Sequence, residues 1–378
     1  MLVSPTAKTA PKEVDRTDWT SDYAYVFVHG LIGWGDNTLM DSIVSYFGTF
    51  SGNLMQYLRS LGLDCHSATL SLENGAWDRA CELYAQLTGT RTDYGKAHSE
   101  QCHHARYGRD FTGRPLIDAF DAEHKINLIG HSFGGTTIIE FLELMANGDA
   151  AEREATPQSE LSPLFAGGKE DWIYSLTTLA SPTNGTTLYE FSNPNTLSLD
   201  GHDRYPGQWI MKLVGSLTEK KTRPLTDNAA FDMQVDRAIS ITNSCETIDS
   251  VYYFSHSTML TETDNEDHQV PNRRMVFIMK PLSKTIGMFE GVTANGVELN
   301  DDWKPNDGLV NTISERAPFN APQKDIDFDN VEPGIWNAFP VRNADHMFYS
   351  GGFLRTTDVR TFYVDYIDWI NSLPAPQP

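Results

Sequence analysis

The sequence is poor in cysteine, in basic residues and in long apolar runs. Four cysteines in 378 residues, without a C-x-x-C spacing, exclude a disulfide-rich scaffold and favour free thiols. Only 29 Lys and Arg stand against 51 Asp and Glu, and the net charge of -22 disfavours nucleic acid and anionic lipid as partners. No apolar run reaches the roughly 18 residues of a transmembrane helix, so none is predicted.

The N-terminus also lacks an apolar signal core, since residues 1–18 are polar and are predicted to form a flexible leader. We expect a secreted, extracellular protein whose export signal is not part of this sequence. A cytoplasmic protein is the alternative, because composition does not separate the two.

From residue 19 onward, short β-rich runs alternate with amphipathic helical stretches. This order is typical of one α/β domain, with a mostly parallel sheet and helices on both faces. Strands are predicted at Tyr23–Val28, Lys125–Ile129, Trp172–Leu179, Val251–Ser255 and Met275–Met279. Helices are predicted at Leu54–Leu61, Asp78–Leu87, Thr136–Met145 and Phe362–Ile370. Prolines and glycines interrupt the pattern over about 186–231, and so long a connection is predicted to be a lid.

Residues 130–134 read Gly-His-Ser-Phe-Gly, a G-x-S-x-G pattern. The pattern alone is weak, but here it directly follows a predicted strand and precedes a predicted helix, as a nucleophile elbow requires. Glycines are needed because larger side chains beside the serine would clash in so tight a turn. Ser132 is therefore the predicted nucleophile, and a plain turn of small residues is the alternative.

A serine hydroxyl needs a general base, so a carboxylate and then a histidine should follow Ser132 along the chain. Among the downstream histidines, His346 precedes the last predicted helix, where a loop at the carboxyl edge of the sheet would carry it. His256 follows a predicted strand and is the runner-up. Asp307 is the predicted acid because it lies in a turn that opens onto an apolar segment, whereas Asp345 is interpreted as a surface residue.

An oxyanion hole needs two backbone N–H groups that point at the developing charge. One is expected from Phe133, the residue after the nucleophile. The other is expected from the glycine-rich loop 29–35, with Leu31 as the donor. Phosphate binding is the alternative for this loop, although it has neither the G-K-[ST] of a P-loop nor the G-x-G-x-x-G spacing.

Residues 98–104 read His-Ser-Glu-Gln-Cys-His-His, an unusual density of metal-binding side chains. Two imidazoles combined with carboxylates, such as Asp78 upstream, suit tetrahedral zinc. A polar loop that is rich in histidine would look the same, so the spacing leaves metal binding open. Because no open-site motif such as H-E-x-x-H is present, a metal bound here is expected to be structural.

Several blocks of the sequence resemble the thermoalkalophilic, zinc-containing bacterial lipases. They are His-Gly-Leu-Ile-Gly-Trp-Gly from His29, Trp-Asp-Arg-Ala-Cys-Glu-Leu from Trp77, Asp-Tyr-Gly-Lys-Ala-His from Asp93, His-Ala-Arg-Tyr-Gly-Arg from His104 and Asn-Asp-Gly-Leu-Val-Asn-Thr from Asn306. The resemblance implies an α/β-hydrolase fold over 19–378 with two insertions. One is a zinc-binding subdomain at about 74–112, and the other is the lid at about 186–231.

The resemblance also implies a set of functional residues. Its catalytic triad falls on Ser132, Asp307 and His346, in agreement with the residues inferred from the motifs. Its zinc ligands fall on Asp78, His98, His104 and Asp232.

Two departures from the family pattern bear on cofactors and substrate. Phe348 stands where the family's calcium site has a glutamate, and residues 352–354 offer no Asp-Pro, so no calcium site is expected. The insertion at 186–231 also looks shorter than the large helical lid of the lipases. This resembles the reduced-lid esterases of the family, some of which attack synthetic polyesters.

The sequence therefore predicts a serine carboxylic-ester hydrolase that acts on small-molecule or polymeric esters, with short to medium acyl chains and polyesters as candidate substrates. A long-chain triacylglycerol lipase with interfacial activation is the first alternative. The others are an acyltransferase, a zinc hydrolase that uses metal-bound water, and a catalytically silent binding protein with the hydrolase fold.

Overall fold

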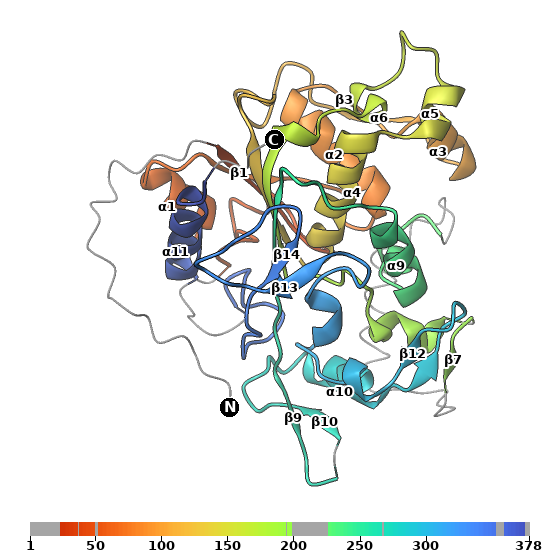
Figure 1. Ribbon diagram of the computed structural model, residues 1–378, viewed down its shortest axis with the longest axis vertical. Coiled ribbons are helices and arrows are strands. Elements are labelled where there is room, and N and C mark those ends of the chain that lie inside the picture. Colours follow the sequence, from red (N-terminus) through yellow and green to blue (C-terminus); the bar gives the residue numbers. More distant parts are fainter. Residues whose placement is uncertain are drawn as a thin grey trace.

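The computed structural model describes residues 23–374 except 37, 50–51, 194, 199–225, 267 and 353–358. The predicted leader, the segment 199–225 of the predicted lid and most of the region considered for calcium therefore lie outside the described residues. Figure 1 shows a central sheet with helices on either side of it. None of the helices described is long and apolar enough to cross a membrane.

The central sheet has seven strands in the order β13-β14-β8-β6-β5-β1-β2, and every neighbouring pair is parallel. The strands are β1 (Ala24–Val28), β2 (Cys65–Ala68), β5 (Ile126–His131), β6 (Ile173–Leu179), β8 (Tyr252–His256), β13 (Gln323–Asp325) and β14 (Trp336–Ala338). The three central strands β5, β6 and β8 are buried along their whole length, as a parallel sheet covered on both faces requires. The predicted α/β class is confirmed.

Both faces of the sheet are covered because its strands alternate their side chains. Tyr25 and Phe27 of β1 pack with α1 (Leu54–Ser60) and α11 (Arg360–Asn371), whereas Val26 and Val28 pack with α2 (Ala76–Thr88) and α4 (Phe133–Asn147). The two helix pairs lie on opposite sides of the sheet in Figure 1.

Smaller elements surround this core. The further helices are α3 (Lys96–Gln101), α5 (Ala150–Ala155), α6 (Pro163–Ala166), α8 (Ala229–Asp232), α9 (Val235–Asn243) and α10 (Lys280–Met288). The further strands are β3 (Arg91–Asp93), β4 (Tyr107–Asp110), β7 (Leu197–Ser198), β9 (Thr261–Thr263), β10 (Gln269–Pro271), β11 (Gly291–Val292) and β12 (Glu298–Leu299). The segment 74–112 consists of α2, the antiparallel pair β3 and β4, and α3 between them.

One predicted strand, Met275–Met279, is wrong, because these residues form turns that lead into α10. Met275, Val276 and Met279 are buried together, whereas Phe277 and Ile278 are 69% and 41% exposed. An apolar run does not by itself identify a strand, because apolar residues in a turn can also be buried when they face the protein interior. Three strands of the sheet, β2, β13 and β14, escaped prediction because they are only three or four residues long and partly polar.

Candidate active site and metal-binding cluster

Ser132 lies in the turn between β5 and α4, at the carboxyl end of the sheet. Its φ is 56°, in the left-handed region that residues with a Cβ rarely adopt. A Cβ on Gly130 would overlap Gly134, and a Cβ on Gly134 would overlap the carbonyl oxygen of Val28. The strained turn therefore depends on both glycines of the G-x-S-x-G pattern, as a nucleophile elbow does.

His346 and Asp307 are in direct contact and both are buried. Nδ1 of His346 is 2.6 Å from Oδ2 of Asp307. Oδ1 of the same carboxylate accepts the N–H groups of Leu309 at 2.9 Å and Val310 at 2.8 Å. The turn that follows Asp307 thus holds the carboxylate towards the imidazole. Because Nδ1 donates to Asp307, the other ring nitrogen of His346, Nε2, is free to accept a proton.

His131 connects the turn of Ser132 to His346. Its Nε2 is 2.9 Å from the carbonyl oxygen of His346, and the two rings lie 5.0 Å apart. Its Nδ1 is 2.7 Å from the hydroxyl of Tyr46. Burial, with the nearby His346, lowers the pKa of His131 to about 3, so the ring is neutral. A neutral ring donates from Nε2 and accepts at Nδ1 from Tyr46. The structure thus brings the turn of Ser132 and the Asp307–His346 pair to one end of the sheet.

The loop expected to contribute to an oxyanion hole is oriented by a buried arginine. Arg79 of α2 donates to the carbonyl oxygen of His29 and, at 3.4 Å, to that of Gly30. In a trans peptide the C=O and N–H groups point in opposite directions. The N–H of Leu31 therefore points away from Arg79. The side chain of Leu31 packs in one cluster with Phe133. The N–H of Phe133 lies in the first turn of α4, where backbone N–H groups have no partner within the helix.

Arg79 was not singled out by any motif, although it lies in a block that resembles the lipases. Its side chain is fully buried, and burial lowers the pKa of the guanidinium to about 10, which leaves it charged at neutral pH. It also donates to the hydroxyl of Thr137 in α4 at 3.0 Å and lies 5.3 Å from the ring of Phe133. One residue of α2 thus joins the loop after β1 to the helix that follows Ser132.

The two residues weighed against His346 and Asp307 lie in other surroundings. The ring of His256 stacks on Phe339 at 3.9 Å and is buried among aromatic side chains. Asp345, interpreted as a surface residue, is only half-exposed, and its carboxylate accepts the N–H of Val276 at 3.2 Å. Neither replaces the contact between His346 and Asp307.

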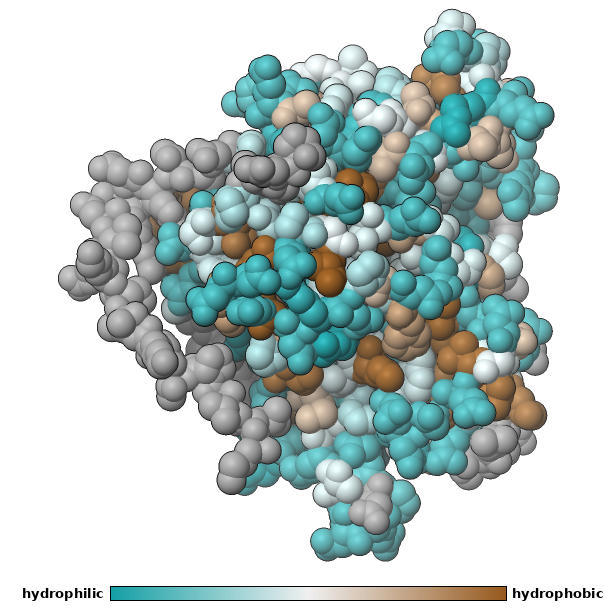
Figure 2. All heavy atoms as spheres, in the orientation of Figure 1, coloured by the Kyte–Doolittle hydropathy of each residue, from teal (hydrophilic) through white to brown (hydrophobic). Residues whose placement is uncertain are grey.

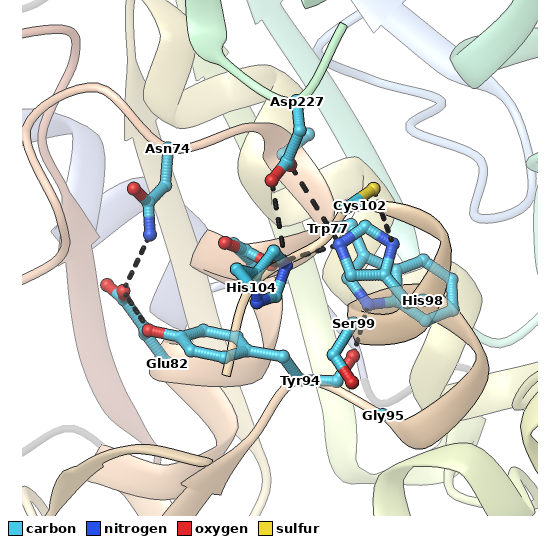
Figure 3. A network of polar contacts seen from close by, with 12 residues as sticks. Asn74, Trp77, Glu82, Tyr94, Gly95, His98, Ser99, Cys102, His104 and Asp227 are labelled. Atoms are coloured by element: carbon cyan, nitrogen blue, oxygen red, sulfur yellow. Dashed lines mark hydrogen bonds and ion pairs between the residues drawn. The ribbon is translucent and has the colours of Figure 1, made fainter. Parts of the chain in front are cut away.

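A second cluster of polar side chains lies where α2, α3 and the segment before α8 meet, and Figure 3 shows His98, His104 and Asp227 facing one another. Oδ1 of Asp78 is 3.1 Å from Nε2 of His98 and 3.7 Å from Nε2 of His104. The carboxylate of Asp227 is 3.9 Å and 3.5 Å from the same two nitrogens. Ligand atoms about 2.0 Å from a tetrahedral zinc ion are about 3.3 Å apart, and these four nitrogen–oxygen distances are close to that value.

The orientation of His104 also fits a metal site. Its Nδ1 is 2.9 Å from the carbonyl oxygen of Ala105 and donates to it, which leaves Nε2 directed at the carboxylates of Asp78 and Asp227. This Nε2 is buried and has no hydrogen-bond partner among the described residues. The ring of His98 is held by stacking on Trp77, 5.0 Å away. A buried imidazole nitrogen that faces two carboxylates without a hydrogen bond is the arrangement that a cation would complete.

The aspartate that completes the cluster is not the one that the resemblance implies as a ligand. The structure places Asp227 beside the two histidines, whereas Asp232 lies outside the cluster. Its Oδ2 accepts the N–H of Ala76 at 2.7 Å, and its Oδ1 accepts from Arg237 at 3.1 Å. Asp232 is thus engaged at the first turn of α2 and with α9. Both aspartates lie in the short polar segment around α8, and residue order alone does not tell which of them turns inward.

Cys102 is a further candidate ligand in this cluster; it lies in the histidine-rich stretch 98–104 but is not among the ligands that the resemblance implies. Its sulfur is 3.9 Å from Nδ1 of His98, the ring nitrogen opposite to the one that faces the carboxylates. Cys102 therefore approaches His98 from the side of the ring opposite to Asp78 and Asp227. All four cysteines of the chain are free, as predicted.

The sequence profile of one protein family, described as the lipase-like C-terminal domain, matches residues 21–198 and 196–370. Among curated proteins, Lipase 2 of Staphylococcus aureus strain N315 is 28% identical over 374 residues, which cover 91% of this chain and 52% of that protein. The chain thus spans about half the length of the curated relatives it matches.

Several solved structures have similar folds, and their matched regions cover nearly the whole of this chain. EstA from Clostridium botulinum has a TM-score of 0.81 and 30% identity, and the match covers 94% of this chain and 88% of that one. Staphylococcus hyicus lipase has a TM-score of 0.78 and 25% identity, with 96% and 98% covered. Lipase 1 from Pelosinus fermentans has a TM-score of 0.76 and 30% identity, with 94% and 100% covered.

Proposed function

Because this chain belongs to the family of the lipase-like C-terminal domain, we propose that it hydrolyses carboxylic esters with Ser132 as the nucleophile. The observation that carries the proposal is the buried contact of 2.6 Å between Nδ1 of His346 and Oδ2 of Asp307, at the end of the sheet where β5 delivers Ser132. The relatives named lipase and esterase support the same class of reaction.

The proposed reaction has two steps. Ser132 attacks the ester carbonyl while Nε2 of His346 accepts the hydroxyl proton, and the N–H groups of Leu31 and Phe133 stabilise the oxyanion. The intermediate collapses when His346 returns the proton to the leaving alkoxy oxygen, so an alcohol departs and an acyl-enzyme remains. Water then attacks the acyl group, with His346 again as the base, and releases the acid. Asp307 orients the imidazole and stabilises its protonated form.

For the substrate, we propose esters of short to medium acyl chains, with polyester chains as an extension of the same class. Several large apolar side chains are exposed: Leu39 and Ile43, in the segment after the loop 29–35, are 80% and 71% exposed, and Phe277, before α10, is 69% exposed. Figure 2 shows brown, apolar surface around α10 and β7, on a molecule that is otherwise largely hydrophilic in this view. Such surface suits an apolar acyl chain or polymer.

We further propose that Asp78, His98, His104 and Asp227 hold a structural zinc ion. Two imidazoles and two carboxylates are ligands that zinc accepts, and the free Nε2 of His104 gives the ion a prepared donor. The ion would tie α2, the end of α3 and the segment before α8 together, without taking part in ester cleavage.

The decisive experiment compares hydrolysis of short- and long-chain nitrophenyl esters by the wild type and by Ser132→Ala. The matched control is Ser60→Ala, an exposed serine at the end of α1. A loss of about three orders of magnitude or more, confined to Ser132→Ala, is expected for a triad nucleophile. Equal activity of wild type and Ser132→Ala would contradict the proposal and favour metal-bound water as the nucleophile.

The remaining alternatives separate in the same assay. Inactivity of the wild type towards every ester would favour a silent binding protein. A sharp rise in rate when a long-chain ester exceeds its solubility would identify an interfacially activated lipase and contradict the proposed substrate range. Capture of the acyl group by added alcohol in preference to water would identify an acyltransferase.

A further inference from the structure

A second carboxyl group lies behind the Asp307–His346 pair. Glu315, at the end of a short 3-10 helix (Thr312–Glu315), is fully buried. Carboxylate oxygens of Glu315 and Asp307 and a ring nitrogen of His346 lie within 4.8 Å of one another. Thr258, which follows β8, lies between the two carboxyl groups. No sequence motif indicated either Glu315 or Thr258.

The contacts of Thr258 limit the number of charges that the two carboxyl groups can carry. Its Oγ1 is 3.0 Å from Oδ2 of Asp307 and also 3.0 Å from Oε2 of Glu315. A threonine hydroxyl has one proton and can donate to only one of these oxygens. If both carboxyl groups were ionised, one of the two contacts would join two acceptors with no proton between them, in a site without access to water.

A proton on Glu315 satisfies both contacts of the Thr258 hydroxyl. Oε2–H of Glu315 then donates to Oγ1 of Thr258, whose own proton is donated to Oδ2 of Asp307. That oxygen also accepts Nδ1–H of His346. Oε2 of Glu315 still accepts the N–H of Thr258 at 2.5 Å. Glu315 thus donates to Thr258, and Thr258 in turn donates to the carboxylate of Asp307 that faces His346.

Two further observations agree with a neutral Glu315. Its Oε1 is buried without a hydrogen-bond partner among the described residues, which costs less for a neutral carboxyl group than for a carboxylate. Burial and the negative charge of Asp307 both raise the pKa of Glu315 well above its ordinary value. For Asp307 burial acts in the same direction, but the charge and the hydrogen bond of His346 outweigh it, and its pKa lies below the usual value.

The other titratable groups around the pair do not change this picture. Burial raises the pKa of Tyr349, which therefore stays neutral. Burial also raises the pKa of Asp345, whose carboxylate accepts the N–H of Val276. The guanidinium of Arg342 lies over the ring of Phe348 at 4.6 Å.

We propose that Glu315 is a neutral carboxylic acid that positions Asp307 through the hydroxyl of Thr258. The inference rests on the proposed function, because Asp307 matters only if His346 is the base. Asp307 is then the only one of the two carboxyl groups behind the imidazole of His346 that carries a negative charge. A second carboxylate there would stabilise the imidazolium in the resting enzyme, and an imidazolium cannot accept the proton of Ser132.

The positioning role is tested with Thr258→Val, which removes the hydroxyl and keeps the N–H that Glu315 accepts. We expect kcat for a soluble ester to fall about tenfold, as for the loss of a hydrogen bond to a charged group, with KM changed less than about twofold. Thr258→Ser restores the hydroxyl and should recover kcat. An unchanged kcat in Thr258→Val, or failure of Thr258→Ser to recover it in a folded protein, would overturn the role.

The protonation state is tested with Glu315→Gln, which is uncharged and similar in shape. If Glu315 is neutral, the variant removes no charge, and the acid limb of the pH dependence of kcat/KM should move by less than about 0.3 pH unit. Removal of a buried carboxylate would move that limb down by about one pH unit or more. Such a shift would overturn the proposal.

A second measurement needs no turnover. The infrared difference between the wild type and Glu315→Gln at pH 7 should contain the carbonyl stretch of a protonated carboxyl group, and a carboxylate signal in its place would overturn the assignment. The infrared result does not depend on whether the protein hydrolyses esters. If Ser132→Ala retained activity, the ester hydrolase proposal would fail while the infrared result still decided the state of Glu315.

Discussion

The acid–base pair and the metal-binding cluster both gather carboxylates and imidazoles, but different forces hold their polar atoms in place. Asp307 is held by N–H groups two and three residues further along its own turn, and its second oxygen contacts His346 at 2.6 Å. In the cluster, the carboxylate of Asp227 is 3.5 Å or more from either imidazole nitrogen. The pair is therefore in direct contact, whereas Asp227 lies further from both imidazoles, at a spacing that the proposed cation would bridge.

The difference indicates how each site should respond to change. A substitution in the acid–base pair should abolish ester hydrolysis in a protein that remains folded, because local turns hold the two side chains in place. Loss of an ion from the cluster should loosen the fold first, because the ion would be the link between three segments. The predictions below separate the two sites by this criterion.

The largest effect is expected from Asp307→Asn. An amide cannot favour the tautomer of His346 that leaves Nε2 free, and kcat should fall by about 10⁴. Circular dichroism, melting temperature and bound metal should match the wild type. A variant that kept more than a tenth of wild-type kcat would remove Asp307 from the proposed reaction.

Next in size is removal of the metal. Metal analysis should find about one zinc per chain, and Asp227→Asn should lose it together with several degrees of melting temperature. An ion at about 1,000 times its Kd contributes about 4 kcal/mol to the free energy of unfolding. Below the melting temperature, kcat should stay within a few-fold of the wild type.

Asp232→Asn is the matched control for the metal-binding cluster. It removes an acceptor from the first turn of α2 but no proposed ligand, so the zinc content should not change. If Asp232→Asn lost zinc and Asp227→Asn retained it, the ligand inferred from the resemblance would be right and the one proposed from the geometry wrong.

A smaller effect on chemistry is expected from Arg79→Met. Without the guanidinium, the carbonyl groups of His29 and Gly30 lose a donor, and the N–H of Leu31 loses its orientation. We expect kcat to fall about a hundredfold, as for removal of one oxyanion donor, with a smaller change in KM. Arg91→Met, at an exposed arginine of β3, is the control. Equal kcat in the two variants would remove Arg79 from the site.

The smallest effect is the contribution of His131 to the pH dependence of stability. Its folded-state pKa is lowered from 6.5 to about 3, so between these values the unfolded chain binds the proton more readily than the folded protein. Stability should therefore be lost as the pH falls below 6.5, by about 1.4 kcal/mol per pH unit for this group.

Denaturant unfolding of the metal-free wild type and the metal-free His131→Gln variant at several pH values checks this, since every other titrating group, the proposed metal ligands included, contributes to both proteins. His131→Gln, which keeps a neutral polar side chain, should show a shallower slope than the wild type over the same range. Identical slopes would mean that His131 is not held neutral by its burial.

Several features could be read from the sequence because they depend on neighbours along the chain. The glycines around Ser132 are required by one tight turn, and alternation along β1 decides which side chains meet which helix pair. The prediction of Met275–Met279 as a strand is wrong for the opposite reason. Apolar character alone does not say whether a segment pairs with a sheet or covers a small cluster.

Residue order was thus sufficient for the α/β class and for the elbow at Ser132, because strand periodicity and turn sterics act over a few residues. It was not sufficient to show that Asp227, rather than Asp232, lies beside the two histidines, or to find Arg79, Thr258 and Glu315. Those residues make contacts with segments far away in the chain, and these contacts form only after the sheet and its helices have packed. Tertiary structure decided these features because desolvation and hydrogen-bond geometry exist only in the folded protein.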